Sequence, residues 1–165
     1  MKIAVHDANV LIDLANGGFL AAWFDLGIET HTTDLVFSEI RDARQQRMVS
    51  PFVRKNLLLI HPCDEAALIN AIDLSTRHGV SISDASALAL AATLEATLLT
   101  GDGRLRKIAP TMQVEARGLL RMLDLLVEQS VMLPRAVAAG LSKIQEQHSF
   151  LPAAECESRL KRWES

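Results

Sequence analysis

Four acidic residues carry the strongest sign of chemistry in this sequence: Asp7, Glu39, Asp84 and Asp102. Carboxylates that are brought together repel one another, and this is tolerated only where cations or basic groups neutralise them. The two cysteines have no Cys or His neighbour at zinc-ligand spacing, so such a site would consist of oxygen ligands. Oxygen ligands suit a hard divalent ion, Mg²⁺ or Mn²⁺, which meets its substrate through phosphate oxygens. We therefore expect Asp7 to be a ligand of such an ion.

Each carboxylate also has an interpretation that involves no chemistry. Asp7 can cap a following helix by accepting its free amide hydrogens. Asp84 can close a capping box with Ser81 ahead of an apolar run, and Asp102 lies in a Gly-Asp-Gly turn. Glu39 can be an exposed helix residue, and two further acids could take its place: Asp34 and Asp42. The joint pattern, rather than any single residue, favours a site.

The elements that must position these residues alternate along the chain, which is typical of parallel βαβ units. Short apolar runs predict strands at 2–6, 28–32, 57–61, 97–100 and 112–114. Helical spacing or composition predicts helices at 34–44, 64–78, 83–96 and 103–108. Because most of the strand residues are apolar on both faces, we expect helices to cover both sides of the sheet.

An open parallel sheet gathers the loops that leave the C-terminal ends of its strands along one edge, where ligands bind. Asp7 follows the first predicted strand, and Asp102 follows the fourth. Glu39 lies in the helix predicted after the second strand, and Asp84 begins the helix that leads into the fourth. All four can converge if the first and fourth strands are neighbours, an order that the sequence does not reveal.

Length and composition indicate a single domain of 165 residues, 49% of them hydrophobic, with ample material for a core. Neither a membrane span nor a signal peptide is evident, so we expect a cytoplasmic protein with no membrane partner and with Cys63 and Cys156 as reduced thiols. Beyond residue 115 the pattern turns helical, with helices expected at 116–130, 134–148 and 153–163. We divide the chain into an α/β domain, 1–130, and a C-terminal helical extension packed on it, 131–165.

Basic residues follow two of the acidic positions closely, although the net charge is −3. They are Arg41, Arg44, Arg47, Arg104, Arg106 and Lys107. Such clusters can hold the phosphates that flank a cleaved bond, or they can be ordinary solvated helix charge. We take Arg41, Arg104, Arg106 and Lys107 as candidate substrate contacts. His6 precedes Asp7, but strand alternation should turn its side chain to the opposite face.

Four short motifs resemble, in order and in spacing, those of PIN-domain ribonucleases, and most closely the VapC-like toxins of toxin–antitoxin pairs. The motifs are DANVLIDL (7–14), SEI (38–40), ISDASALALA (82–91) and LLTGDGRLRK (98–107). The resemblance covers residues 1 to about 125 well, and the remaining helices are similar to the extension of some members. It implies a three-layer α/β/α sandwich around a mainly parallel five-stranded sheet.

The resemblance also implies roles for individual residues. Asp7, Asp84 and Asp102 match the metal-binding aspartates of the family, and Glu39 matches its acidic residue on the second helix. Two polar residues match those that steady the metals or their waters: Asn9 and Thr100. The implied activity is Mg²⁺- or Mn²⁺-dependent cleavage of RNA phosphodiesters, without a Ser, Cys or His nucleophile. The implied partners are RNA and a cognate antitoxin protein. The apolar residues at helical spacing in the C-terminal helices offer a surface for a homodimer.

Other functions remain alternatives. A haloacid-dehalogenase-type phosphatase needs a second aspartate two positions after its nucleophile, where this chain has Asn9. A response-regulator receiver would use an acid after the third strand, such as Asp64, and a lysine after the fifth, where the chain has none. A catalytically silent PIN-like protein that only binds RNA or another partner is the third alternative, and the retained acids favour an enzyme over it.

Overall fold

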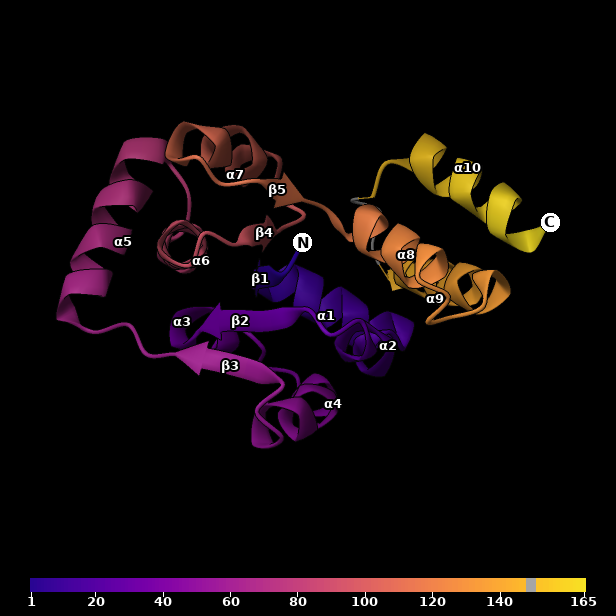
Figure 1. Ribbon diagram of the computed structural model, residues 1–165. Coiled ribbons are helices and arrows are strands. Elements are labelled where there is room, and N and C mark those ends of the chain that lie inside the picture. The colour runs from indigo at the N-terminus through magenta and orange to yellow at the C-terminus, as the bar shows by residue number, and fades with distance from the viewer. Residues whose placement is uncertain (148–150) are drawn as a thin grey trace.

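The computed structural model describes residues 1–147 and 151–165, and its centre is one parallel sheet (Figure 1). The strands are β1 (Ile3–His6), β2 (Glu29–Thr33), β3 (Leu58–His61), β4 (Thr97–Leu99) and β5 (Ala116–Arg117). Their order is β3-β2-β1-β4-β5, and every pair is parallel. β1 therefore lies beside β4, as convergence of the acids requires, and the strand order reverses between these two strands.

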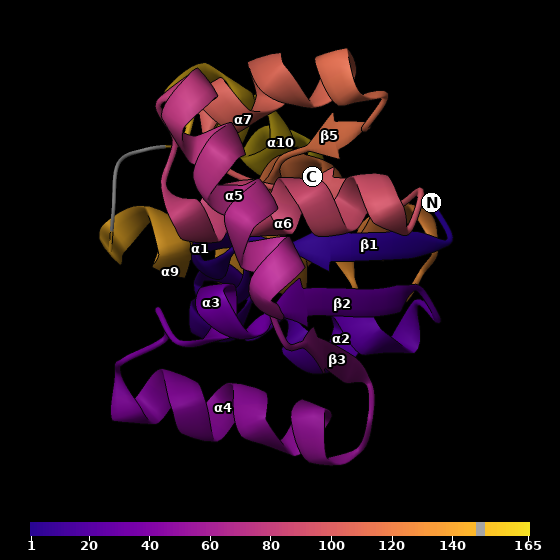
Figure 2. The same cartoon turned by 90° about the vertical axis from the view of Figure 1, so that its left-hand side faces the viewer.

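Helices cover both faces of the sheet (Figures 1 and 2). One layer consists of α3 (Asp34–Phe37), α5 (Glu65–His78), α6 (Ile82–Thr93) and α7 (Gly103–Ile108). The other consists of α1 (Ala8–Gly17), α2 (Leu20–Asp25) and α4 (Ala43–Arg54). Outside this second layer lie α8 (Leu119–Glu128), α9 (Pro134–Gln147) and α10 (Ala153–Glu164). The predicted three-layer α/β fold with a C-terminal helical extension is confirmed.

Strand alternation divides the core into two hydrophobic clusters, one on each face of the sheet. Ala4 and Leu99 face the cluster built with α1, α2 and the C-terminal helices. Val5 and Leu98, their immediate neighbours, face the cluster built with α5, α6 and α7. Cys63 and Cys156 are both free, as predicted. Among the described residues, no helix is long and apolar enough to span a bilayer.

The helix predicted over 34–44 is wrong, because the chain breaks there into two helices. α3 ends at Phe37, where the Ser38 hydroxyl donates to the Leu35 carbonyl at 2.7 Å. Asp42 then caps α4 by accepting from the Gln45 amide at 2.9 Å. Glu39 therefore lies in the turn between α3 and α4 and not on a helix, and the sequence prediction missed α4.

The strand predicted over 112–114 is also wrong. A short 3-10 helix, Ala109–Met112, has Pro110 in its first turn, and Gln113 follows with a left-handed φ of 59°. The fifth strand forms only beyond this turn, at Ala116–Arg117, where it pairs with β4. Pattern alone missed α2 as well. The other predicted elements are present with shifted ends, and the predicted last residue of the 134–148 helix, His148, lies outside the described residues.

The C-terminal helices share the core of the sheet domain. α9 crosses α1 closely at a pair of glycines, Gly17 and Gly140. A Cβ atom on Gly140 would lie 2.6 Å from the Gly17 carbonyl oxygen and 2.3 Å from the Phe19 ring. Only glycine fits this crossing. The division of the chain at residue 130 stays a prediction, because the packing continues across it.

Replacement of Gly140 by Ala should destabilise the protein by about 1–3 kcal/mol, the usual cost of overpacking. Alanine favours helices more than glycine does, so intrinsic propensity predicts the opposite sign. Chemical denaturation of both proteins measures the difference. An unchanged or greater free energy of unfolding in the variant would show that α9 does not approach α1 this closely.

His6 is enclosed in the core beneath the sheet edge. Its side chain has no exposed surface, its ring packs edge-on against Trp23 at a centroid distance of 5.1 Å, and neither ring nitrogen has a hydrogen-bond partner among the described residues. Burial lowers the pKa of His6 to about 3. The ring is therefore neutral at physiological pH, and it cannot reach a substrate.

This burial predicts acid sensitivity. The unfolded chain binds a proton at His6 below a pKa of 6.5, whereas the folded chain does so only near 3. The free energy of unfolding should therefore fall by about 1.4 kcal/mol for each unit by which the pH decreases between these two values. We expect His6→Leu to remove this part of the slope in denaturation curves, while the exposed His78→Gln leaves it in place. Equal slopes for wild type and His6→Leu would contradict the prediction.

Candidate active site

Asp7 lies at the junction of β1 and α1, and its carboxylate is almost wholly enclosed, with 2% exposure. One oxygen, Oδ1, accepts from the Val10 amide at 2.9 Å and so caps α1. The other, Oδ2, accepts from the Thr100 hydroxyl. The Asp7 amide donates to the Leu99 carbonyl at 3.0 Å, which ties the junction to the end of β4. The predicted capping role is therefore present together with burial that capping does not require.

Thr100 links Asp7 to Asp102. While its hydroxyl donates to Asp7, the same oxygen accepts from the Asp102 amide at 3.0 Å. Asp102 is half-buried and caps α7 by accepting from the Arg104 amide at 2.7 Å. The loops that leave β1 and β4 are thus joined through one buried side chain, Thr100, which has no exposed surface.

Asp84 and Glu39 approach from the neighbouring elements. Asp84 lies in the first turn of α6, where its amide donates to the Ser81 hydroxyl at 3.1 Å, as in the predicted capping box. Glu39 is exposed and accepts a short hydrogen bond from Ser83, which anchors the α3–α4 turn to α6. The sequence prediction missed Ser83, and its position directly before the predicted Asp84 was the available signal.

The pKa values show that these acids are electrostatic neighbours. Burial, and to a smaller extent the charge of Asp84, raise the pKa of Asp7 to about 6, although the hydrogen bonds from Thr100, Val10 and Gly101 act in the opposite direction. Burial also raises the pKa of Asp84, as do the charges of Asp102 and Glu39, while the bond with Ser81 acts in the opposite direction. The acids do not form a tight cluster: within residues 1–147 and 151–165, no group of three or more His, Cys, Asp or Glu side chains could hold a metal ion.

A hollow of about 500 Å³ opens beside Asp102. It is lined by Asn9, Ile12, Asp13, Gly101, Asp102, Gly103 and Leu151. The exposed Asn9 therefore shares this space with Asp102, whereas Glu39 and Asp84 lie outside its lining. Thr100, the other predicted polar helper, acts from beneath through its two hydrogen bonds.

The four predicted substrate contacts have different surroundings. The Arg104 guanidinium donates to the Gly79 carbonyl at 3.1 Å and is thus held toward the end of α5. Arg106 lies over Gly118, where an added Cβ would be 3.4 Å from its Nη1 atom. Arg41 and Lys107 are exposed, and the described part of the chain offers them no ion pair.

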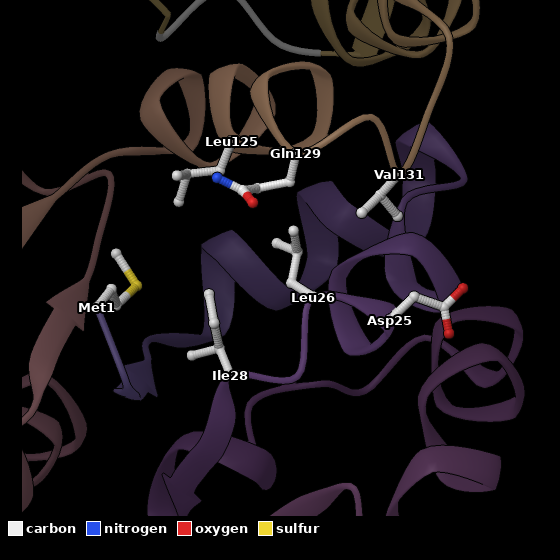
Figure 3. A pocket seen from close by; sticks show the side chains of 7 residues that line it. All are labelled: Met1, Asp25, Leu26, Ile28, Leu125, Gln129 and Val131. Carbon is white, nitrogen blue, oxygen red and sulfur yellow. The ribbon is translucent and has the colours of Figure 1, made fainter.

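A second hollow, of about 430 Å³, lies at the opposite end of the strands (Figure 3). Its lining side chains come from the residues just before β1 and β2, from the end of α2, and from α8 and the turn after it: Met1, Asp25, Leu26, Ile28, Leu125, Gln129 and Val131. Leu125 and Val131 extend toward Leu26 and Ile28 across the gap. This hollow is lined by a single carboxylate, Asp25, and by none of the predicted site residues, so the prediction that the chemistry lies at the other edge is unchanged.

Comparison with known proteins agrees with this architecture. A family model described as "DUF3368: PIN domain" matches residues 3–165. The structure of PAE2754 from Pyrobaculum aerophilum is similar with a TM-score of 0.53 and 18% identity, covering 78% of this chain and 97% of that one. FitAcB from Neisseria gonorrhoeae gives a TM-score of 0.46 and 18% identity, covering 68% and 95%.

At such identities, structural likeness concerns the fold alone, and the PAE2754 match supports it. A search of curated protein sequences finds no match. The family match extends over nearly the whole chain, including the C-terminal helices, and it agrees with the motif resemblance in the sequence. The chain therefore belongs to the PIN-domain family.

Proposed function

We propose that this PIN-domain protein is an endoribonuclease that depends on Mg²⁺ or Mn²⁺, with Asp7, Asp84 and Asp102 as metal ligands and Glu39 completing the acidic site. The observation that carries the proposal is the buried Asp7 carboxylate. Burial and the charge of Asp84 raise its pKa to about 6, and the described residues provide no cation beside it. A divalent ion bound here would offset that cost.

Mg²⁺ does not require the four acids to form a compact cluster. This ion keeps several waters and is usually held by one or two carboxylates together with phosphate oxygens of the substrate. A preformed cage of three carboxylates is therefore not required. Asp7 is oriented by Thr100 and Val10, and Asp102 by Arg104, so two of the proposed ligands have fixed positions before any ion binds.

A bound divalent ion would supply charge that activates water and stabilises the leaving oxygen. The chain supplies the positions around it. Thr100 joins the loops that carry Asp7 and Asp102, and Asn9 offers an amide to the hollow beside Asp102. We assign both as supporting residues. Ser83 adds to them by holding Glu39 near Asp84.

We further propose, from the motif resemblance to VapC-like proteins, that the enzyme is the toxin of a toxin–antitoxin pair and acts in the cytoplasm. A catalytically silent protein that binds RNA is the second candidate. The observation that favours it is the absence, among the described residues, of a compact group of metal-binding side chains.

The Asp7 carboxylate predicts a stability effect that does not depend on activity. In the folded chain its pKa is raised from 3.8 to about 6. The free energy of unfolding of the wild type therefore decreases as the pH rises from about 4 through 6 and Asp7 loses its proton. Without metal at about pH 8, Asp7→Asn should be more stable than wild type by up to about 3 kcal/mol. The gain should vanish below about pH 4.

Added Mg²⁺ or Mn²⁺ should raise the melting temperature of the wild type but not of Asp7→Asn, since only a protein that binds the ion is stabilised by it. Asp73→Asn is the matched control, because Asp73 is exposed and paired with Arg77 on α5. An equal or smaller rise in the melting temperature of the wild type than of Asp7→Asn would refute the assignment of Asp7.

Incubation of labelled RNA with the purified protein tests the activity. We expect cleavage with Mg²⁺ or Mn²⁺, none with a chelator, and a loss of at least about a hundredfold in Asp7→Asn and Asp102→Asn. Asp73→Asn should cleave like wild type. Cleavage that persists under chelation and in both variants would overturn the mechanism, and RNA binding without any cleavage would favour the silent alternative. Growth arrest on expression, lost in the same variants, tests the toxin role.

A further inference from the structure

A third hollow, of about 250 Å³, adjoins the hollow beside Asp102 and is basic in character. It is lined by Gly101, Arg106, Ala116, Arg117, Gly118, Leu119, Leu120, Arg121, Leu151, Pro152, Glu155 and Arg159. Gly101 and Leu151 line both hollows. The acidic edge of the sheet therefore continues directly into a space surrounded by four arginines and one glutamate.

Three of these arginines already have carboxylate partners. Arg117 pairs with Glu115, Arg121 pairs with Glu128, and Arg159 is held by Asp124 and Glu155. Arg106 differs, because the described residues provide no ion pair or hydrogen bond for its guanidinium. It is an exposed positive charge in the lining of the basic hollow.

The Arg106 guanidinium lies against the backbone at Gly118. A Cβ on Gly118 would lie 3.4 Å from Arg106 Nη1 and 3.7 Å from the Thr100 carbonyl oxygen, which places this guanidinium beside the loop that leaves β4. Gly118 is also the first residue before α8, and no side chain caps that helix. The Arg106 side chain and uncapped amides of α8 thus border the same space.

We propose that this hollow binds a phosphodiester of a single-stranded RNA that flanks the bond to be cleaved, with Arg106 as its principal contact. The inference rests on the proposed function and extends it. A planar guanidinium matches phosphate oxygens with two parallel hydrogen bonds. The exposed ion pairs of Arg117 and Arg121 are weak, so both can turn to a phosphate when one arrives.

The position of the basic hollow also explains why a bound RNA strand would pass through it. A polyanion that enters the acidic edge is repelled by Asp84 and Glu39 unless cations beside that edge attract its other phosphates. The basic hollow begins at Gly101, one residue from Asp102. Pro152, Glu155 and Arg159 form its other wall, so the C-terminal extension becomes part of the RNA path.

Binding can be measured separately from cleavage. A fluorescein-labelled RNA of about 12 nucleotides, within the site size of single-strand-binding folds, is titrated with protein in a chelator, and anisotropy reports the affinity. We expect Arg106→Ala to bind about tenfold more weakly at low salt. The slope of log K against log salt should become shallower by about 0.7, the value for one phosphate contact on a single strand. Arg106→Lys should restore most of the slope.

The matched control is Arg77→Ala, which removes the same charge from the exposed face of α5. It should change neither affinity nor slope. With Mg²⁺ present, Arg106→Ala should raise KM about tenfold and leave kcat nearly unchanged. A series of RNAs with one neutral methylphosphonate linkage should reveal a single linkage that weakens wild type and has no further effect on Arg106→Ala.

Equal affinity and slope in wild type and Arg106→Ala would overturn the proposal. So would competition by an acidic peptide that depends on Arg106 as strongly as RNA binding does, since the occupant would then be a protein. If the chain fails to cleave RNA but Arg106 still governs binding in the chelator, the proposed nuclease is wrong and this subsite stands.

Discussion

The arrangement of the acidic edge of the sheet depends on one constraint, the burial of the Asp7 carboxylate. A charged side chain at the end of β1 is costly to enclose, and its two hydrogen bonds do not remove the cost, because the pKa stays raised to about 6. Thr100 can reach Asp7 only because β4 lies beside β1 in the sheet. The strand order thus places a polar anchor from one βα unit beneath the carboxylate of another.

The C-terminal helices stabilise the same junction from behind. α1, which Asp7 caps, packs closely against α9 where Gly17 and Gly140 meet. α10 is fixed in turn to α8, because Asp124 accepts from Arg159 at 2.8 Å and from Arg162 at 2.6 Å. Asp124 is 8% exposed, so these bonds lie in a region of reduced solvent screening. The C-terminal extension therefore supports α1, the helix that Asp7 caps, and it contributes Arg159 to the lining of the basic hollow.

Much of the edge was predictable because its residues follow strands. Asp7 and Asp102 come directly after apolar runs, and the geometry of a parallel sheet determines where such residues lie. Glu39 was harder to place. The stretch 34–44 has helical composition, and only Asp42, a good cap, indicated that a second helix begins there.

The fifth strand and the basic hollow could not be predicted from the sequence pattern, for a different reason. β5 comprises two residues after a left-handed turn, too few to produce a periodic signal. Arg106, Arg121 and Arg159 come from three helices, and their grouping depends on how α8 and α10 pack. No spacing along the chain encodes such a grouping. What the sequence indicated was the sign of charge after Asp102, not which arginine is available.

The charge arrangement has a consequence for binding order. The chain has a net charge of −3, so it gains little from long-range attraction to a polyanion. Attraction must be local, and Arg104 contributes less because its guanidinium is engaged with Gly79. In the proposed enzyme, a divalent ion neutralises the acids while Arg106 attracts a neighbouring phosphate. Each makes the other more effective, because a strand held at one point raises the local concentration of phosphate at the next. Metal and RNA should therefore bind cooperatively.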